Sequence, residues 1–200
     1  MADAGGAVEP GGAFAIRTVA VIGAGRVGRS FALACAAAGF DVVLEDVMPA
    51  KLRRAQEEYA ELSPVGVASA GRLRVALTVE DAVRAADLAV DFVPDELESK
   101  LEIFCLVDRM APPKTVLLMP SDALSISDLA SCTYRGERCF AVRGMVVGDA
   151  FEAAKPVRLL HPTGAAAEAS NAVVSFLRAL GCAVRVEEDR DAPMLVRNYL

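Results

Sequence analysis

An apolar run that breaks into a glycine turn constrains this chain more than any other feature. Residues 19–22 are all apolar, and Gly23, Gly25 and Gly28 follow in the pattern G-x-G-x-x-G. An apolar run before such glycines predicts a buried strand, and the small residues after them, up to Ala38, predict a helix. Gly23 permits the tight turn, Gly25 lets a diphosphate approach the backbone, and Gly28 lets the helix lie close to the sheet. The helix start also offers unpaired N–H groups and a positive dipole end to phosphate.

An acidic residue stands where such a motif needs one. A second apolar segment, residues 41–44, ends in Glu45 and Asp46, eighteen residues after Gly28. A carboxylate there accepts hydrogen bonds from the adenosine ribose and repels a 2′-phosphate, so the pattern favours NAD(H) over NADP(H). The alternative is a structural glycine turn in which Asp46 caps the next loop. Within the turn, Arg26 either pairs with a phosphate or is solvated, and Val27 borders the same site.

Length, composition and charge exclude several classes of protein. The chain has 200 residues, enough for one domain with a core, and its formal net charge of −6 argues against a nucleic-acid partner. Five cysteines without a C-x-x-C pair and a single histidine give no zinc-ligand set and fit a reducing cytoplasm. No segment is apolar enough to cross a membrane. Residues 1–14 lack the features of a signal peptide, so we expect a flexible Gly/Ala-rich tail before one dinucleotide-binding domain over 15–200.

Strands and helices are expected to alternate along the chain. Such alternation implies parallel βαβ units and therefore an α/β fold. The expected strands are 17–22, 41–45, 73–77, 88–93, 115–119, 139–142, 157–160 and 183–186. The expected helices are 26–38, 49–61, 79–85, 95–110, 125–132 and 164–180, with Ser125 as an N-cap and Gly181 closing the last helix.

Further motifs are similar to those of a known family. Residues 28–32 read G-R-S-F-A, close to a G-R-S-W-A motif, and residues 93–100 read V-P-D-E-L-E-S-K, close to V-P-E-D-L-E-L-K. Residues 124–126 and 137–138 match an L-S-I and an E-R without a gap. On these motifs the chain resembles, over roughly residues 17–200, the NAD-binding domain of the L-3-hydroxyacyl-CoA dehydrogenases, including the lambda-crystallin (gulonate dehydrogenase) branch.

The resemblance implies a Rossmann-type fold, which is a doubly wound, mostly parallel sheet with helices on both faces, and NAD as the cofactor. It also implies that Asp95 and Lys100 border the nicotinamide ribose. The plainer alternative for Asp95 and Glu96 is a helix start, where the dipole favours acids. In the family a helical domain follows and provides the dimer interface. This chain ends at Leu200, so we expect either that a homodimer or a partner subunit supplies the missing wall of the substrate cleft, or that the cleft has no such wall.

Several family positions carry other residues here. Residues 119–123 read M-P-S-D-A where the family has S-N-T-S-S, so Asp122 stands in place of a substrate-contacting serine. The resemblance places Arg143 at the catalytic histidine and Arg158, after a three-residue insertion, at the catalytic glutamate. The asparagine of a later signature corresponds to Asn198.

These replacements change the chemistry that we expect. Oxidising a secondary alcohol by hydride transfer needs a base for the hydroxyl proton, and arginine stays protonated at working pH. Arg143 and Arg158 could instead clamp a carboxylate or phosphate, and Asp122 is either a base or the ion-pair partner of Arg143. His161 lies in an L-H-P segment that the lambda-crystallin branch shares outside its catalytic pair, which favours a loop-packing role over a displaced base.

We therefore expect an NAD(H)-binding protein related to 3-hydroxyacyl-CoA dehydrogenases, with the catalytic pair replaced and without that activity. The alternative is a diverged NAD-dependent oxidoreductase, or another enzyme, with a rebuilt site for a small anionic hydroxy acid or acyl thioester. A third interpretation is an interaction scaffold that has lost its cofactor. The expected partners are a dinucleotide and a small anionic substrate, with no membrane and no metal.

Overall fold

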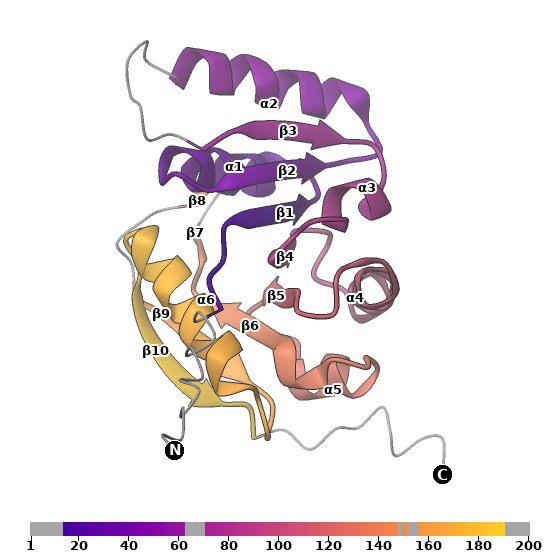
Figure 1. Ribbon diagram of the computed structural model, residues 1–200, viewed down its shortest axis with the longest axis vertical. Helices are drawn as coiled ribbons and strands as arrows, with labels where there is room; N and C mark the ends of the chain where they lie inside the picture. The colour runs from indigo at the N-terminus through magenta and orange to yellow at the C-terminus, as the bar shows by residue number, and fades with distance from the viewer. Residues whose placement is uncertain (1–13, 63–70, 148–149, 152–155, 191–200) are drawn as a thin grey trace, which may run out of the picture.

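The structure is a computed structural model that describes residues 14–62, 71–147, 150–151 and 156–190 (Figure 1). The tail expected over 1–14 lies outside this range except for Phe14, and so does Asn198. Phe14 packs against the core, and the guanidinium of Arg138 lies 5.6 Å from the centre of its ring.

Within the described residues, eight strands form one sheet in the order β10-β9-β6-β5-β4-β1-β2-β3 (Figure 1). The six strands from β3 to β6 are parallel neighbours, β9 is antiparallel to β6, and β10 is parallel to β9. The order reverses between β1 and β4, which defines a doubly wound sheet and confirms the expected α/β class. The strands are β1 Thr18–Ile22, β2 Asp41–Glu45, β3 Leu73–Ala76, β4 Leu88–Asp91, β5 Val116–Pro120, β6 Cys139–Arg143, β9 Pro156–His161 and β10 Ala183–Glu188.

Helices cover both faces of the sheet because its strands are apolar on both sides. The first face packs against α1 (Arg26–Ala37), α2 (Pro49–Leu62) and α6 (Ala167–Ala179), in a core that includes Phe31 and Phe176. The second packs against α3 (Val79–Val83), α4 (Leu97–Met110) and α5 (Ile126–Ser131), in a core that includes Phe104. Figure 1 shows α3, α4 and α5 together on one side, with α1 and α6 on the other.

The expected and observed elements differ mainly at their ends. Helix α4 begins at Leu97 rather than at residue 95, because the backbone of Pro94 and Glu96 forms a turn first, with the Glu96 amide donating to the Pro94 carbonyl at 2.8 Å. Helix α6 begins at Ala167 rather than at residue 164, because Gly164 adopts a φ of 80°. Two short strands that were not among the expected ones, β7 (Val146–Val147) and β8 (Ala150–Phe151), pair antiparallel with each other, and a short 3₁₀ helix, η1, spans Gly136–Arg138.

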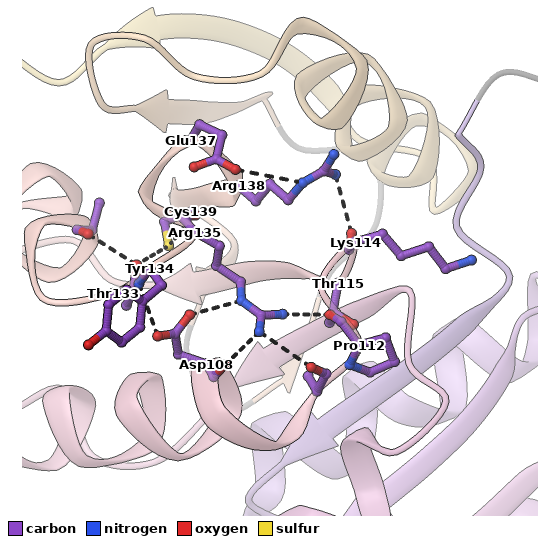
Figure 2. A network of polar contacts seen from close by, with 12 residues as sticks. Asp108, Pro112, Lys114, Thr115, Thr133, Tyr134, Arg135, Glu137, Arg138 and Cys139 are labelled. Atoms are coloured by element: carbon purple, nitrogen blue, oxygen red, sulfur yellow. Dashed lines mark hydrogen bonds and ion pairs between the residues drawn. The ribbon is translucent and has the colours of Figure 1, made fainter. Parts of the chain in front are cut away.

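A buried arginine fixes the carboxyl end of α4 to the segment before η1 (Figure 2). Arg135 Nε donates to Asp108 Oδ1 at 2.9 Å, and the other guanidinium nitrogens donate to the carbonyls of Asp108 and Pro112 at 2.6 Å. The Asp108 carbonyl belongs to the last turn of α4, where helix geometry leaves oxygens without intrahelical partners, and the Pro112 carbonyl, in the loop after it, also accepts from the Thr115 amide at 3.0 Å. Arg135 therefore ties the segment before β6 to the end of α4 and to the loop that leads into β5.

Candidate functional site

The glycine turn between β1 and α1 lies at the carboxyl edge of the sheet, where the strand order reverses. Gly23 has a φ of 98°, and its amide donates to the Glu45 carbonyl at 2.9 Å. A Cβ on Gly28 would stand 2.0 Å from the Gly23 carbonyl oxygen. The backbones of the strand and the helix therefore approach each other so closely that only glycine fits at Gly28, and the left-handed φ favours glycine at Gly23.

Gly25 has a different environment, although it belongs to the same motif. It is exposed, it precedes the first turn of α1 with a φ of −60°, and no atom of the described residues lies within 4 Å of its hypothetical Cβ. The protein itself therefore does not require glycine here. The open space in front of the α1 amino terminus is the space that a diphosphate needs, and a side chain at Gly25 would enter it. Arg26 and Val27 form the start of α1 beside this space.

Asp46 connects the end of β2 to the glycine turn. Its Oδ2 accepts hydrogen bonds from the Ala24 amide at 2.9 Å and from Lys51 Nζ at 3.0 Å, and its Oδ1 accepts from the Met48 amide at 2.9 Å. Burial acts to raise the pKa of Asp46, but the hydrogen bonds from Lys51 and two backbone amides outweigh it and hold the pKa below its usual value. Asp46 is thus charged, caps the following loop, and lies where the motif places a ribose.

Three exposed apolar side chains follow the ends of β2 and β3, and the sequence analysis did not single them out. Val47 is 80% exposed, Met48 50% and Leu77 56%. Glu45 and Ala76, which precede them in the chain, are paired across the two strands, so these side chains lie near one another and beside Asp46. The sequence does contain a signal for two of them, because Val47 and Met48 directly follow Asp46, the acid that the motif places at the binding site. Such a surface suits the flat face of an aromatic base.

A cavity of about 280 Å³ lies at the carboxyl ends of β4, β5 and β6. Its lining brings together four residues that the sequence analysis singled out at different places in the chain, namely Val27, Asp95, Lys100 and Asp122. The other lining residues are Phe92, Val93, Pro120, Ser121, Val142 and Met145. Because Val27 belongs to the glycine turn, the cavity is adjacent to the space in front of α1.

Lys100 lines this cavity but is itself fully buried. Its Nζ donates to the Asp91 carbonyl at 2.9 Å and lies 3.5 Å from Asp91 Oδ1. The second carboxylate oxygen of Asp91 is buried and has no hydrogen-bond partner among the described residues. Burial raises the pKa of Asp91 to about 6, although Lys100 acts in the opposite direction. Lys100 therefore holds the end of β4 as well as contributing to the cavity wall.

Asp95 and Asp122 are each tied to a neighbouring strand end. Ser121 Oγ donates to Asp95 Oδ2 at 2.9 Å, and Asp122 Oδ1 accepts from the Gly144 amide at 2.9 Å. Asp95 precedes the N-cap of α4, so its side chain links that helix start to β5 rather than capping it. The ion pair between Asp122 and Arg143, expected as one alternative, is not formed in the part of the chain that the structure describes. The Gly144 amide donates to Asp122 Oδ1 instead.

The structure brings Arg143 and Arg158 together. The resemblance leads us to expect this, because the two positions hold the catalytic histidine and glutamate in the family. They face each other across the antiparallel strands β6 and β9. Arg158 donates to Glu187 Oε2 from Nε at 3.0 Å and from Nη2 at 2.6 Å, and these bonds raise the pKa of the Arg158 guanidinium. Both arginines line a second cavity, of about 520 Å³.

The remaining site expectations lie apart from these cavities. His161 ends β9, and its Nδ1 is 3.0 Å from the Pro162 carbonyl, while neither cavity is lined by it. Among the described residues no group of three or more His, Cys, Asp or Glu could hold a metal ion. No helix in the same residues has the length and apolar character needed to cross a membrane.

A doubly wound sheet with a glycine turn and a following acid at its point of reversal defines the class of dinucleotide-binding domains. The sequence model of the family "3-hydroxyacyl-CoA dehydrogenase, NAD binding domain" matches residues 18–145. The chain belongs to this family, and NAD is the cofactor of the family. This confirms the resemblance seen in the sequence and its implied cofactor.

Curated relatives and solved structures agree with this assignment. The chain is 29% identical over 195 residues to 3-hydroxybutyryl-CoA dehydrogenase of Bradyrhizobium diazoefficiens, covering 92% of this chain and 66% of the relative. It is 34% identical over 152 residues to L-carnitine dehydrogenase of Pseudomonas syringae, covering 72% of this chain and 45% of the relative. The (S)-3-hydroxybutyryl-CoA dehydrogenase structure from Ralstonia eutropha has a TM-score of 0.77 at 23% identity, covering 92% of this chain and 67% of that one, and shows the same fold. The chain thus spans between about half and two thirds of the length of these relatives.

Proposed function

We propose that NAD(H) binds along the carboxyl edge of the sheet, with its diphosphate on the turn from Gly23 to Gly28. The open space at Gly25 carries this proposal, because nothing in the packing of the protein needs a glycine there. The adenosine ribose would bond to Asp46, and the adenine would lie against Val47 and its apolar neighbours. The nicotinamide end would enter the cavity beside Asp95 and Lys100. When bound, NAD supplies a nicotinamide ring that exchanges a hydride.

We further propose that the chain does not oxidise 3-hydroxyacyl-CoA by the chemistry of its family. Two facing guanidiniums at Arg143 and Arg158 support this proposal. A guanidinium stays protonated at working pH, so neither residue can take the proton of a hydroxyl group, and Arg158 donates to Glu187 instead of orienting a base. His161 is the last residue of β9, and its Nδ1 bonds to the Pro162 carbonyl. It does not line the cavity that contains Asp95 and Lys100.

The test of this proposal compares binding and turnover in the same preparation. We expect NADH to bind in a calorimetric titration, and we expect no NADH absorbance to appear when the protein is mixed with NAD⁺ and 3-hydroxybutyryl-CoA. The Bradyrhizobium diazoefficiens dehydrogenase, assayed in parallel, serves as the active control. NADH formation by this chain would contradict the loss of activity, and an absence of NADH binding would contradict the cofactor site.

The alternative is a rebuilt oxidoreductase that acts on a small anionic hydroxy acid or acyl thioester. The carboxylate of Asp122, which lines the same cavity as Lys100, is the observation that favours it. A carboxylate can act as a general base, as a guanidinium cannot. We expect Asp122→Asn to lower any NAD-dependent turnover found in a substrate panel by about a hundredfold or more. The exposed control Asp81→Asn should leave that turnover unchanged, and equal turnover in both variants would reject Asp122 as the base.

We also propose a cytoplasmic location, because all five cysteines are free thiols and such thiols persist in a reducing compartment. We also propose that the chain associates with a second copy of itself or with a partner subunit. Size-exclusion chromatography with light scattering, with and without NADH, measures the oligomeric state directly.

A further inference from the structure

Three arginines form a row across one face of the sheet. Arg143 on β6 is paired with Arg158 on β9, and Arg158 is paired with Arg185 on β10. Paired residues on neighbouring strands point to the same face, and neighbouring strands lie about 4.8 Å apart. The three guanidiniums therefore stand side by side, and all three line the cavity of about 520 Å³.

The row carries more positive charge than its neighbours neutralise. Among the residues that the structure describes, Glu187 is the acid that bonds to it, accepting from Arg158 at 2.6 Å and from Arg185 at 3.0 Å. The other two acids of the cavity wall are engaged elsewhere. Glu188 accepts from Thr163 at 2.7 Å, and the Asp189 carboxylate accepts from the Ser127 amide at 2.9 Å. Like charges placed directly opposite each other are unfavourable, and the one carboxylate of Glu187 does not balance the three positive charges of the row.

Arg143 is the member of the row to which Glu187 makes no hydrogen bond, although the two charges attract each other. Its Nε is buried and has no hydrogen-bond partner among the described residues, which leaves a desolvated donor of a permanently charged group. A buried donor left unpaired costs free energy that an anion in the cavity would recover. The cavity volume suits a small molecule rather than a polymer.

We propose that Arg143, Arg158 and Arg185 form a binding site for the carboxylate or phosphate group of a small molecule. Guanidiniums form paired, charge-assisted hydrogen bonds with both of these anions. Arg143 follows Val142, which lines the neighbouring cavity together with Asp122, so the anion lies next to the space proposed for the nicotinamide end of NAD(H). This inference rests on the proposed function, in which Arg143 and Arg158 are not catalytic groups. It adds the chemical class of the ligand that the cleft binds.

The test titrates the intact protein with inorganic phosphate and, separately, with malonate, at constant ionic strength set by chloride. The readout is the set of arginine Nε–H signals in a ¹H–¹⁵N NMR spectrum. We expect the Arg143 signal to move with saturation for at least one of the two anions. We expect Arg143→Gln to weaken that binding by about tenfold or more, as loss of a charge-assisted bond implies. Arg74→Gln, which removes an exposed arginine on β3, is the matched control and should bind as the native protein does.

Arg185→Gln is the second variant, because the Arg185 side chain is 81% exposed and its loss should leave folding intact. We expect it to weaken anion binding as well, so the proposal can be judged even if Arg143→Gln does not fold. The proposal is overturned if neither anion shifts the arginine signals, or if both row variants bind like Arg74→Gln. NADH titrations of the same samples separate the two proposals. NADH binding without anion binding would contradict only the arginine site, and the reverse would contradict only the dinucleotide site.

Discussion

At the scale of single residues, two glycines of one motif have different physical surroundings. Gly28 is required by the packing of the protein, since a Cβ there would stand 2.0 Å from a backbone oxygen. Gly25 has open space around its hypothetical Cβ, so packing does not require glycine there, and the proposed reason is the diphosphate of NAD(H). The motif predicts both roles; the geometry of the turn agrees with the packing role of Gly28, and the ligand role of Gly25 stays a prediction.

Alanine substitutions should separate the two roles. We expect Gly28→Ala to lower the free energy of unfolding by about 2–3 kcal/mol, because the methyl group forces the strand and helix apart. We expect Gly25→Ala to change it by less than about 0.5 kcal/mol while weakening NADH binding by about tenfold or more. Urea unfolding and NADH titration measure the two quantities. Equal losses of stability in the two variants would show that Gly25 also serves the fold.

At the scale of elements, the end of α4 depends on one side chain from a distant segment. Figure 2 shows the Arg135 guanidinium reaching Asp108 and the carbonyls that follow α4. The Arg135 residue is 8% exposed, so this ion pair is largely shielded from water. Breaking a buried pair leaves an uncompensated charge, which costs more than the pair itself contributes.

We therefore expect Arg135→Ala to lower the free energy of unfolding by about 3–5 kcal/mol. Arg135→Lys should recover only part of this loss, because an ammonium group cannot bond in a planar fork to several oxygens at once. Arg109→Ala removes an exposed arginine from the last turn of the same helix and should change stability by less than about 0.5 kcal/mol. Urea denaturation followed by circular dichroism measures all three. A small loss in Arg135→Ala would mean that water replaces the guanidinium.

At the scale of the whole molecule, stability depends on two carboxyl groups buried at the carboxyl edge of the sheet. Burial, and then the charge of Asp46, raises the pKa of Glu45 to about 7, and burial raises that of Asp91 to about 6. The folded protein therefore binds more protons than the unfolded chain between the ordinary carboxyl pKa and these raised values. Stability from these groups is present at low pH and is lost as the pH rises through about 6 to 7.

We accordingly expect the free energy of unfolding to fall between pH 5 and pH 8, as measured by urea denaturation at several pH values. Glu45→Gln should reduce this fall, since the amide carries no proton that can be lost. Glu57→Gln alters an exposed residue of α2 and should leave the pH dependence as it is. If stability rose across the same interval, the raised carboxyl pKa values would be refuted.

The sequence predicted most of the fold because the signals for it are local. Apolar runs marked the strands, and Ser125 was recognised as an N-cap, which its hydrogen bond from the Asp128 amide bears out. The start of α4 was placed two residues early, because the turn of Pro94 and Glu96 depends on how the chain leaves β4. The bond between Lys51 and Asp46, and the pairing of Lys100 with Asp91, were not predicted, since burial decides which charges must meet.

By itself, the sequence determined the glycine turn, the acid that follows it and the identity of the groups at the altered positions. These follow from backbone sterics within a few residues and from the fixed charge of a guanidinium. Only the tertiary structure decided that Arg143, Arg158 and Arg185 stand in one row. The register between strands distant in sequence is set by how the whole sheet packs its two apolar faces, and no local pattern in the chain records it.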